Sequence, residues 1–275
     1  MQNLKPEANE VDKIIDQLID TASRIRQQIN DMDLKVRRKK TQGQARFANQ
    51  YELDVLADNI VHDDFADFPG YIVSEERELD KAQLEKNSML LVVDPVDGST
   101  NASHNIGYWC FSAALIWEGH VIAGVVVDQV SRRVFVATED RGATMTLSDG
   151  SKRILDPNNF DQEDVGSPAD NFSSSLICFS SHEGPSIPFR HLRHFGSSAL
   201  AICDTACGGF DAYIDDEDVL LKPWDLLAAE YIAEKAGCKV LRRDSEGLMA
   251  ATGVFVTRSE SLIGHFQKLF PHFFH

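Results

Sequence analysis

Two aspartates three residues apart, Asp94 and Asp97, follow a run of aliphatic residues in the stretch LLVVDPVDGSTN at 90–101. Pro95 between them fixes its own φ near about −65°, and Gly98 permits backbone conformations that a side chain would oppose. This geometry can turn both carboxylates toward one point. Carboxylates about 4 Å apart repel each other by roughly 4 kcal/mol at an effective dielectric constant of about 20. Such a pair must share a proton, bind a cation or diverge, and a divalent cation is the strongest remedy.

The motif favours Mg²⁺ or Mn²⁺ over zinc, because it offers oxygen ligands and contains no His or Cys. Ser99 and Thr100 add hydroxyls, and the backbone N–H groups after Gly98 can form the open start of a helix, where phosphate binds well. Taken alone, Asp-x-x-Asp-Gly is more often a structural turn. Two distant acidic segments support the hypothesis of a metal site, namely SEE at 74–76 and Trp-Asp at 224–225. Each has an ordinary explanation, a solvated pair and a helix cap, so the hypothesis rests on the combination.

The spacing of apolar residues predicts two helices and then a sheet before residue 146. Apolar positions three and four apart indicate amphipathic helices over 7–30 and 50–65. The segment 68–76 then becomes extended, and short apolar runs separated by turn residues predict an antiparallel meander. The runs are 88–94, 109–117, 121–128 and 132–139.

Strands and helices alternate in the second half, which predicts α/β layering. Predicted strands are 175–180, 211–215, 239–243 and 253–259, and predicted helices are 197–209, 223–237 and 260–270. Polar turn sequences at 156–159 and 167–175 predict a boundary between two subdomains, 1–160 and 161–275. We expect the first, an α+β unit, to carry the metal site and the second, an α/β unit, to complete the substrate site.

Composition indicates an ordinary globular protein. The chain has 275 residues, is 43% hydrophobic and carries a formal charge of −16, which opposes binding to nucleic acid or to an anionic membrane. No apolar run approaches the roughly 20 residues of a membrane span, and the first residues lack a secretory pattern, so we expect a cytoplasmic protein. The five cysteines lack a Cys-x-x-Cys pair and are expected to be reduced, mostly core residues. The basic run 37–40 is expected to be a solvated loop or helix end, with an anion-docking patch as the alternative.

Three separated motifs resemble the inositol monophosphatase family, whose superfamily includes fructose-1,6-bisphosphatases and 3′-phosphoadenosine-5′-phosphate phosphatases. DPVDGSTN resembles its Asp-Pro-(Ile/Leu/Val)-Asp-Gly-(Thr/Ser) signature, VSEE its Gly-Glu-Glu segment, and KPWDLLAAEYIAEKAG its second signature. FGSSAL and GGFDAYID match in order and spacing as well. The resemblance covers about residues 45–260 and implies a layered α-β-α-β-α sandwich of α/β (α+β) class.

The resemblance also implies roles for individual residues. The implied metal ligands are Glu75, Asp94, Asp97, Asp225 and the backbone carbonyl of Val96. Glu75 and Ser99 would orient the attacking water, so that the implied catalytic residues are Glu75, Asp94, Asp97, Ser99 and Asp225. Gly98, Ser99 and Thr100 would hold the phosphate, and Gly196, Ser197, Ser198 and Asp215 would contact the hydroxyl-bearing part of the substrate.

The implied enzyme is a phosphatase that uses two or three Mg²⁺ ions, with Mn²⁺ as a possible substitute, and needs no covalent phosphoenzyme. Four carboxylates would repel a substrate phosphate unless such ions reverse the local charge. Inositol monophosphate is the first candidate substrate. The alternatives are fructose-1,6-bisphosphate, a 3′-phosphonucleotide, histidinol phosphate and, outside enzymes, a weakened member with a binding or regulatory role. The resemblance also implies a homodimer.

Two departures from the family pattern bear on this prediction. The family places an Asp before the second helix where this chain has Asn49, which loses a charge near the nucleophile. We expect Asn49→Asp to leave turnover unchanged or to raise it. The extra residues in DDEDVLLKPWD make the substrate-facing rim atypical and leave the choice of substrate open.

Overall fold

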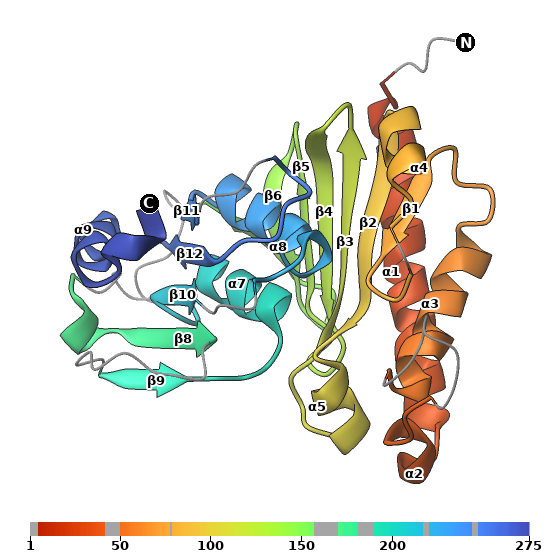
Figure 1. The fold of residues 1–275 in the computed structure, drawn as a ribbon, viewed down its shortest axis with the longest axis horizontal. Helices are drawn as coiled ribbons and strands as arrows, with labels where there is room; N and C mark the ends of the chain where they lie inside the picture. The colour runs from red at the N-terminus through yellow and green to blue at the C-terminus, as the bar shows by residue number, and fades with distance from the viewer. Residues whose placement is uncertain are drawn as a thin grey trace.

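Two sheets and three layers of helices form the molecule, in the order α-β-α-β-α (Figure 1). The structure, a computed structural model, describes residues 5–41, 50–77, 79–156, 170–180, 190–216, 220–243 and 247–274. Within these residues no helix is both long enough and apolar enough to cross a membrane. The five layers confirm the sandwich predicted from the sequence.

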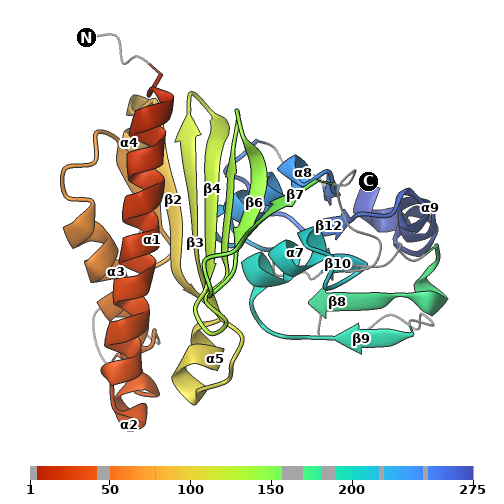
Figure 2. The same cartoon turned by 180° about the vertical axis from the view of Figure 1, so that it is seen from behind.

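The first layer holds α1 (Ala8–Asp31) and α3 (Glu52–Asp64), with the short α2 (Leu34–Arg37) between them in the chain. The spacing that predicted α1 is confirmed, since its buried residues lie on one stripe. That stripe packs on a face of the first sheet together with α3, and the shared core contains Leu18, Ile25 and Leu53. Figure 2 shows α1 running along the whole sheet.

The first sheet has seven strands in the order β1-β2-β3-β4-β5-β6-β7. Only β1 and β2 are parallel in it, and β2 to β7 form the antiparallel meander predicted from the sequence, which extends further than predicted. The strands are β1 (Tyr71–Ser74), β2 (Met89–Asp97), β3 (Cys110–Trp117), β4 (His120–Asp128), β5 (Val134–Thr138), β6 (Gly142–Thr146) and β7 (Lys152–Leu155). The sequence prediction missed β6, β7 and the short helix α4 (Lys81–Lys86), whereas the helix start predicted after Gly98 is present as α5 (Ser99–His104).

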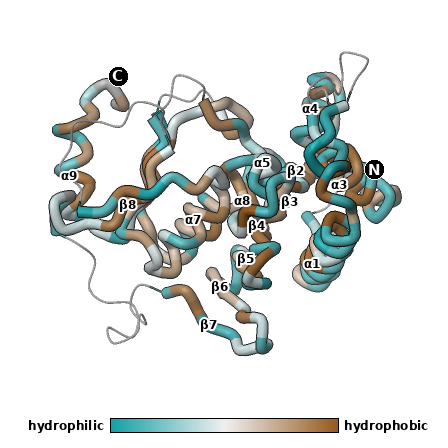
Figure 3. The backbone as a smooth tube through the Cα atoms, turned by 90° about the horizontal axis from the view of Figure 1, so that it is seen from below, coloured by the Kyte–Doolittle hydropathy of each residue, from teal (hydrophilic) through white to brown (hydrophobic). Residues whose placement is uncertain are grey.

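The middle layer consists of α7 (Ser198–Ala206) and α8 (Pro223–Lys235). Eight of the nine residues of α7 and nine of the thirteen residues of α8 are buried, because sheets lie on either side of these helices. Figure 3 shows the corresponding pattern, with hydrophobic residues concentrated at the centre and hydrophilic ones along the outer side of α1. The start of each helix therefore faces the interior of the molecule.

The second sheet has five strands in the order β11-β12-β10-β8-β9 and is mixed, with β12 antiparallel to its neighbours. Its outer face is covered by α9 (Glu260–Leu269) through an aromatic core that includes Phe255 and Phe266. The strands are β8 (Leu176–Ser180), β9 (His191–Arg193), β10 (Ala212–Asp215), β11 (Lys239–Arg242) and β12 (Val254–Thr257). The predicted alternation of strands and helices is confirmed.

Strands of the first sheet end at Leu155 and those of the second begin at Leu176. The boundary predicted at 160/161 falls outside the described residues and stays a prediction. All five cysteines are free, and four of them are buried, which confirms the expected core thiols.

Candidate metal centre

A bulge in β2 places Asp94 and Asp97 on the same face of the first sheet. Residues three apart on a regular strand point to opposite faces. Here Asp94 pairs with Ser112 of β3 and Asp97 with Cys110, so three steps along β2 match two along β3. Such a bulge redirects a side chain. Because Cys110 and Ser112 share a face, their partners do too, and this face is the one that α7 and α8 cover.

Glu75 reaches the same place from β1. Ser74, the last residue of β1, pairs in parallel with Val93, so that Glu75 emerges beside Asp94 at the carboxyl end of two parallel strands. The amide of Glu75 donates to the Val93 carbonyl at 3.2 Å. Binding sites commonly form at such strand ends.

Asp225 comes from the opposite side, in the first turn of α8. Its Oδ2 accepts a hydrogen bond from the Lys222 amide at 2.7 Å, so it does cap the helix. Pro223 begins α8, where its missing N–H costs nothing. The Ser112 hydroxyl, next to Asp94 in the sheet, donates to the Trp224 carbonyl at 3.3 Å and joins β3 to this helix start. Asp225 is therefore both a cap and a member of the acidic centre.

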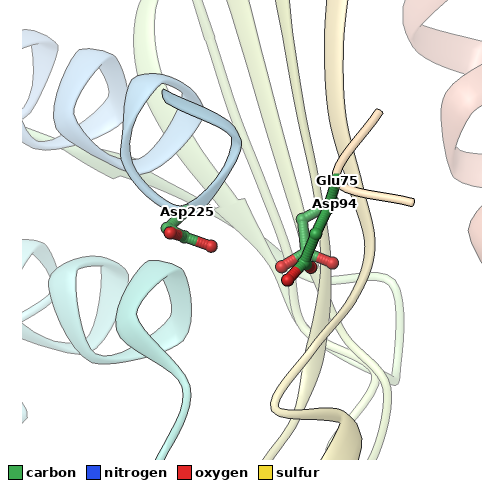
Figure 4. A group of neighbouring side chains, drawn as sticks. All are labelled: Glu75, Asp94 and Asp225. Atoms are coloured by element: carbon green, nitrogen blue, oxygen red, sulfur yellow. The ribbon is translucent and has the colours of Figure 1, made fainter. Parts of the chain in front are cut away.

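Glu75, Asp94 and Asp225 converge on one point (Figure 4). Each offers a carboxylate oxygen, and these oxygens all lie within 4.8 Å of one another. The three residues belong to segments that are 19 and 131 positions apart in the chain, at 75, 94 and 225. The structure thus brings oxygen donors of three of the residues predicted as metal ligands together from three separate segments.

The electrostatics of this group fit a divalent cation. Burial, followed by the charges of Glu75, Asp97 and Asp225, raises the pKa of Asp94 well above its usual value. Burial and the charges of Glu75 and Asp97 likewise raise the pKa of Asp225. The Glu75 carboxylate is open to solvent on one side, yet desolvation by the surrounding atoms still raises its pKa to about 7. Both the loss of hydration and the mutual repulsion that raise these pKa values are offset when a hard cation binds the carboxylates.

Asp97 lies beside this group but holds a different set of contacts. Its Oδ2 accepts hydrogen bonds from the Ser197 hydroxyl at 2.7 Å and the Ala199 amide at 2.8 Å, while the Cys110 thiol lies 3.6 Å away. Asp97 is not among the three residues whose oxygens lie within 4.8 Å of one another, although its charge acts on all three. One of its oxygens is committed to α7, and the other is left for the centre.

The residues predicted to hold phosphate come directly after Asp97 in the chain. Gly98 has a φ of 92°, and a Cβ there would lie 3.0 Å from the Gly196 carbonyl oxygen, so only glycine fits without strain. α5 begins at Ser99, and the first N–H groups of a helix have no partner within it. Asn101 donates to the carbonyls of Tyr108 at 2.7 Å and Phe195 at 2.5 Å, which ties this turn to the segment before α7.

The residues predicted to contact the substrate lie around the same turn. Gly196 adopts a φ of 76° and packs against Asn101, and Ser197 holds Asp97. The Ser198 hydroxyl accepts a hydrogen bond from the Tyr213 hydroxyl at 2.9 Å, and buried Asp215 is near enough to raise the pKa of Asp225. The side chain of Val96 is buried, and its amide donates to Asp94 Oδ1 at 2.8 Å.

The sequence analysis missed two buried carboxylates behind Glu75. The ordinary explanation of Glu75 and Glu76 as a solvated pair does not hold for Glu76, because that residue is only 6% exposed and its Oε2 has no hydrogen-bond partner among the described residues. Burial and the charges of Asp54, Glu75 and Asp58 raise the pKa of Glu76 to about 9. Burial is also the largest cause that raises the pKa of Asp54 to about 7, with a contribution from Glu75. An acidic residue at an inward position of the predicted helix over 50–65 was the available signal for Asp54.

The basic run at 37–40 forms a helix end, as expected from the sequence. Arg37 is buried and donates to the carbonyls of Met32 and Asn30, and Lys39 pairs with Glu52 at 2.9 Å. These contacts leave little of the run for an anion-docking patch. Asn49, the residue at which the chain departs from the family pattern, lies outside the described residues.

The comparisons with known proteins agree on one family. The sequence model described as "Inositol monophosphatase family" matches residues 7–270. Inositol-1-monophosphatase SuhB of Mycobacterium tuberculosis is 31% identical over 156 residues, which are 54% of this chain and 52% of that protein. A fructose-1,6-bisphosphatase/inositol-1-monophosphatase of Archaeoglobus fulgidus is 26% identical over 182 residues, 64% of each chain. The chain thus spans between about half and two thirds of the length of these curated relatives.

The fold is similar over a greater length than the sequence. The solved structure of Mycobacterium tuberculosis SuhB superimposes with a TM-score of 0.72 at 22% identity and covers 98% of both chains. At this identity the likeness shows the fold alone.

Proposed function

Because the chain belongs to the inositol monophosphatase family, we propose that it is a Mg²⁺-dependent phosphomonoesterase for a small phosphorylated polyol or sugar. Inositol monophosphate is the first candidate substrate. The observation that carries the proposal is the convergence of Glu75, Asp94 and Asp225, with oxygens within 4.8 Å of one another, beside the glycine turn that begins α5. A phosphate would enter this acidic centre only if cations reversed its charge.

In the proposed enzyme the metal ligands are Glu75, Asp94, Asp97, Asp225 and the Val96 carbonyl, which would hold two or three Mg²⁺ ions, or Mn²⁺ in their place. When bound, such ions make water a stronger nucleophile and neutralise charge on the leaving oxygen. The donor set fits them, because it is made of oxygens and the carboxylates are desolvated.

Residues of the chain would supply the positioning. Glu75 and Ser99 would orient the attacking water, and Gly98, Ser99 and Thr100 would hold the phosphate with N–H and O–H groups. Gly196, Ser197, Ser198 and Asp215 would face the hydroxyl-bearing part of the substrate. Contacts between the glycine turn and α7, namely Asn101 with Phe195 and Asp97 with Ser197, support placing phosphate and hydroxyl recognition side by side.

A panel of phosphate esters tests the proposal. We expect the purified chain with Mg²⁺ to release phosphate from inositol monophosphate with the highest kcat/KM. The panel also includes fructose-1,6-bisphosphate, a 3′-phosphonucleotide and histidinol phosphate. EDTA should abolish release, and Asp225→Asn, purified in the same way, should reduce it strongly, which excludes a contaminating phosphatase. Absence of release from every ester would overturn the proposal.

Calorimetry with Mg²⁺ and a phosphate ester separates the enzyme from the binding or regulatory alternative. Binding without turnover would favour that alternative, whereas turnover would end it. The homodimer and the cytoplasmic location stay predictions, and light scattering of the purified chain tests the dimer.

A further inference from the structure

Asp58 in α3 lies near the residues on both sides of the Glu75–Glu76 pair. Its Oδ2 accepts a hydrogen bond from Arg77 Nε at 2.6 Å, and its side chain is 2% exposed. Burial alone would raise the pKa of Asp58, but interactions with His62, with the Ser74 hydroxyl and with Arg77 outweigh it and lower that pKa. Ser74 precedes the glutamate pair and Arg77 follows it. Asp58 thus holds Arg77 at one end of the turn by a hydrogen bond and lies near Ser74 at the other, where its Oδ1 makes no hydrogen bond among the described residues.

Few backbone hydrogen bonds hold this turn, and the one inside it, from the Glu75 amide to the Val93 carbonyl at 3.2 Å, fixes the backbone of Glu75 but not the direction of its side chain. The Arg77 amide donates to the Ser74 carbonyl at 3.2 Å, and the Glu76 amide lies 3.4 Å from the Ser74 hydroxyl that faces Asp58. Among the described residues, the Glu75 carboxylate contacts no N–H group and shares hydrogen bonding only with Asp94. The direction of Glu75 therefore depends on how its neighbours are fixed.

The two glutamates have opposite surroundings. Glu75 points to the acidic centre, whereas Glu76 is buried on the side of Asp54 with Oε2 unpaired. A turn free to shift by one residue could exchange them. We propose that Asp58 is a positioning residue, which holds the Arg77 end of this turn so that Glu75 and not Glu76 faces the metal. The inference rests on the proposed function in one respect, since it treats Glu75 as a metal ligand.

The test compares Asp58→Asn in the full chain with Asp128→Asn. Asp128 is a matched control, because it is also buried and pairs with an arginine, Arg133, at 2.8 Å, but it lies at the end of β4 and contacts no residue of the turn. Mn²⁺ binding to the metal-free proteins is measured by calorimetry. Hydrogen exchange of residues 71–77 is measured in the same metal-free samples.

We expect Asp58→Asn to weaken Mn²⁺ binding by about 10-fold or more, the usual effect of removing a group that orients a metal ligand. Exchange at 75–77 should become faster, and kcat at saturating Mn²⁺ should stay within about 3-fold of the wild type. Asp128→Asn should leave the Mn²⁺ Kd within about 2-fold. Arg77→Gln, a milder change at a partly exposed residue, should act in the same direction and add little to Asp58→Asn.

The outcomes separate this inference from the proposed function. If the wild type fails to bind Mn²⁺, the proposed metal enzyme is wrong. If the wild type binds Mn²⁺ and both turn variants bind it equally well, the positioning role is wrong and the enzyme stands. An equal loss in Asp128→Asn would show a general effect of breaking a buried pair and would also overturn the inference.

Discussion

The two sides of the acidic centre are held in different ways. On the side of the middle helices, Asp97 accepts from the Ala199 amide near the start of α7 and Asp225 from the Lys222 amide at the start of α8. On the side of the first sheet, Glu75 has no backbone donor among the described residues and is open to solvent. Helix starts therefore fix one side, whereas the Asp58 side chain holds the turn on the other.

This difference distinguishes oxygens committed to the fold from oxygens left for a cation. A carboxylate that caps a helix keeps its orientation whether or not metal is present. The direction of Glu75 depends on its flanking residues and, in the proposed enzyme, on the cation. We expect the helix side to be preorganised and the Glu75 side to respond more strongly to metal.

The largest expected effect on activity comes from removing the charge of Asp225 while keeping its hydrogen bond at the start of α8. Asp225→Asn keeps an oxygen for the Lys222 amide but removes a charge from the centre, and we expect kcat/KM to fall by roughly 10²–10³-fold. Stability of the metal-free protein should not fall, because the raised pKa of Asp225 shows that its charge is unfavourable there. Steady-state kinetics and thermal unfolding with EDTA measure both. Retention of more than about a tenth of wild-type activity would contradict the assignment.

A pH effect on metal-free stability should follow from the carboxylates around Glu75. The pKa is raised to about 7 for Glu75 and Asp54 and to about 9 for Glu76, from unfolded values near about 4. The folded state therefore binds more protons, and its stability should decrease as pH rises through this range. With EDTA, we expect Tm at pH 8.5 to be at least about 3 °C below Tm at pH 6.

Saturating Mg²⁺ should narrow this gap, because a cation stabilises the ionised form of Glu75. Glu76→Gln serves as the comparison, since it removes a buried ionisable group that we do not assign to the metal. In EDTA, this substitution should reduce the decrease in Tm at the alkaline end of the pH range. A Tm that increases with pH in EDTA would refute the arrangement.

A smaller loss is expected when Asp97 loses a donor. Ser197→Ala removes a hydrogen bond to a buried charged group, worth about 1.5–3 kcal/mol, and we expect kcat/KM to fall by about 10-fold or more. Thr205→Ala is the matched control, because, in the part of the chain that the structure describes, this buried hydroxyl in α7 donates to the Ala201 carbonyl and to no residue of the centre. Kinetics of the two variants side by side check the prediction, and an equal loss in both would mean that the helix, not Asp97, is sensitive.

The smallest effect should come from an ion pair far from the centre. Lys239 and Glu260 lie 3.1 Å apart on the surface, with side chains 54% and 73% exposed. Glu260→Gln should change the free energy of unfolding by less than about 0.5 kcal/mol, because solvent screens such pairs. Urea denaturation measures this free energy of unfolding. If Glu260→Gln lowered it by as much as the about 1.5–3 kcal/mol expected for the Ser197 hydrogen bond, activity losses at the centre could not be attributed to local contacts.

Local sequence pattern predicted most helices and strands. The apolar stripe of α1 and the continuous apolar run of β2 are decided by residues close in the chain, so periodicity was sufficient. β6 and β7 were missed because the pairing that forms them comes from neighbouring strands, and their own sequences are short and mixed in polarity.

The sequence by itself determined which residues are the candidates for the proposed chemistry, since carboxylates, a glycine turn and hydroxyls occur in motifs whose order can be read along the chain. Only the tertiary structure decided how they are held. The β2 bulge that turns Asp94 and Asp97 to one face, the α7 start that occupies one oxygen of Asp97, and the burial of Glu76 all depend on segments remote in sequence. Burial and pairing are properties of the packed molecule, and therefore no local pattern could supply them.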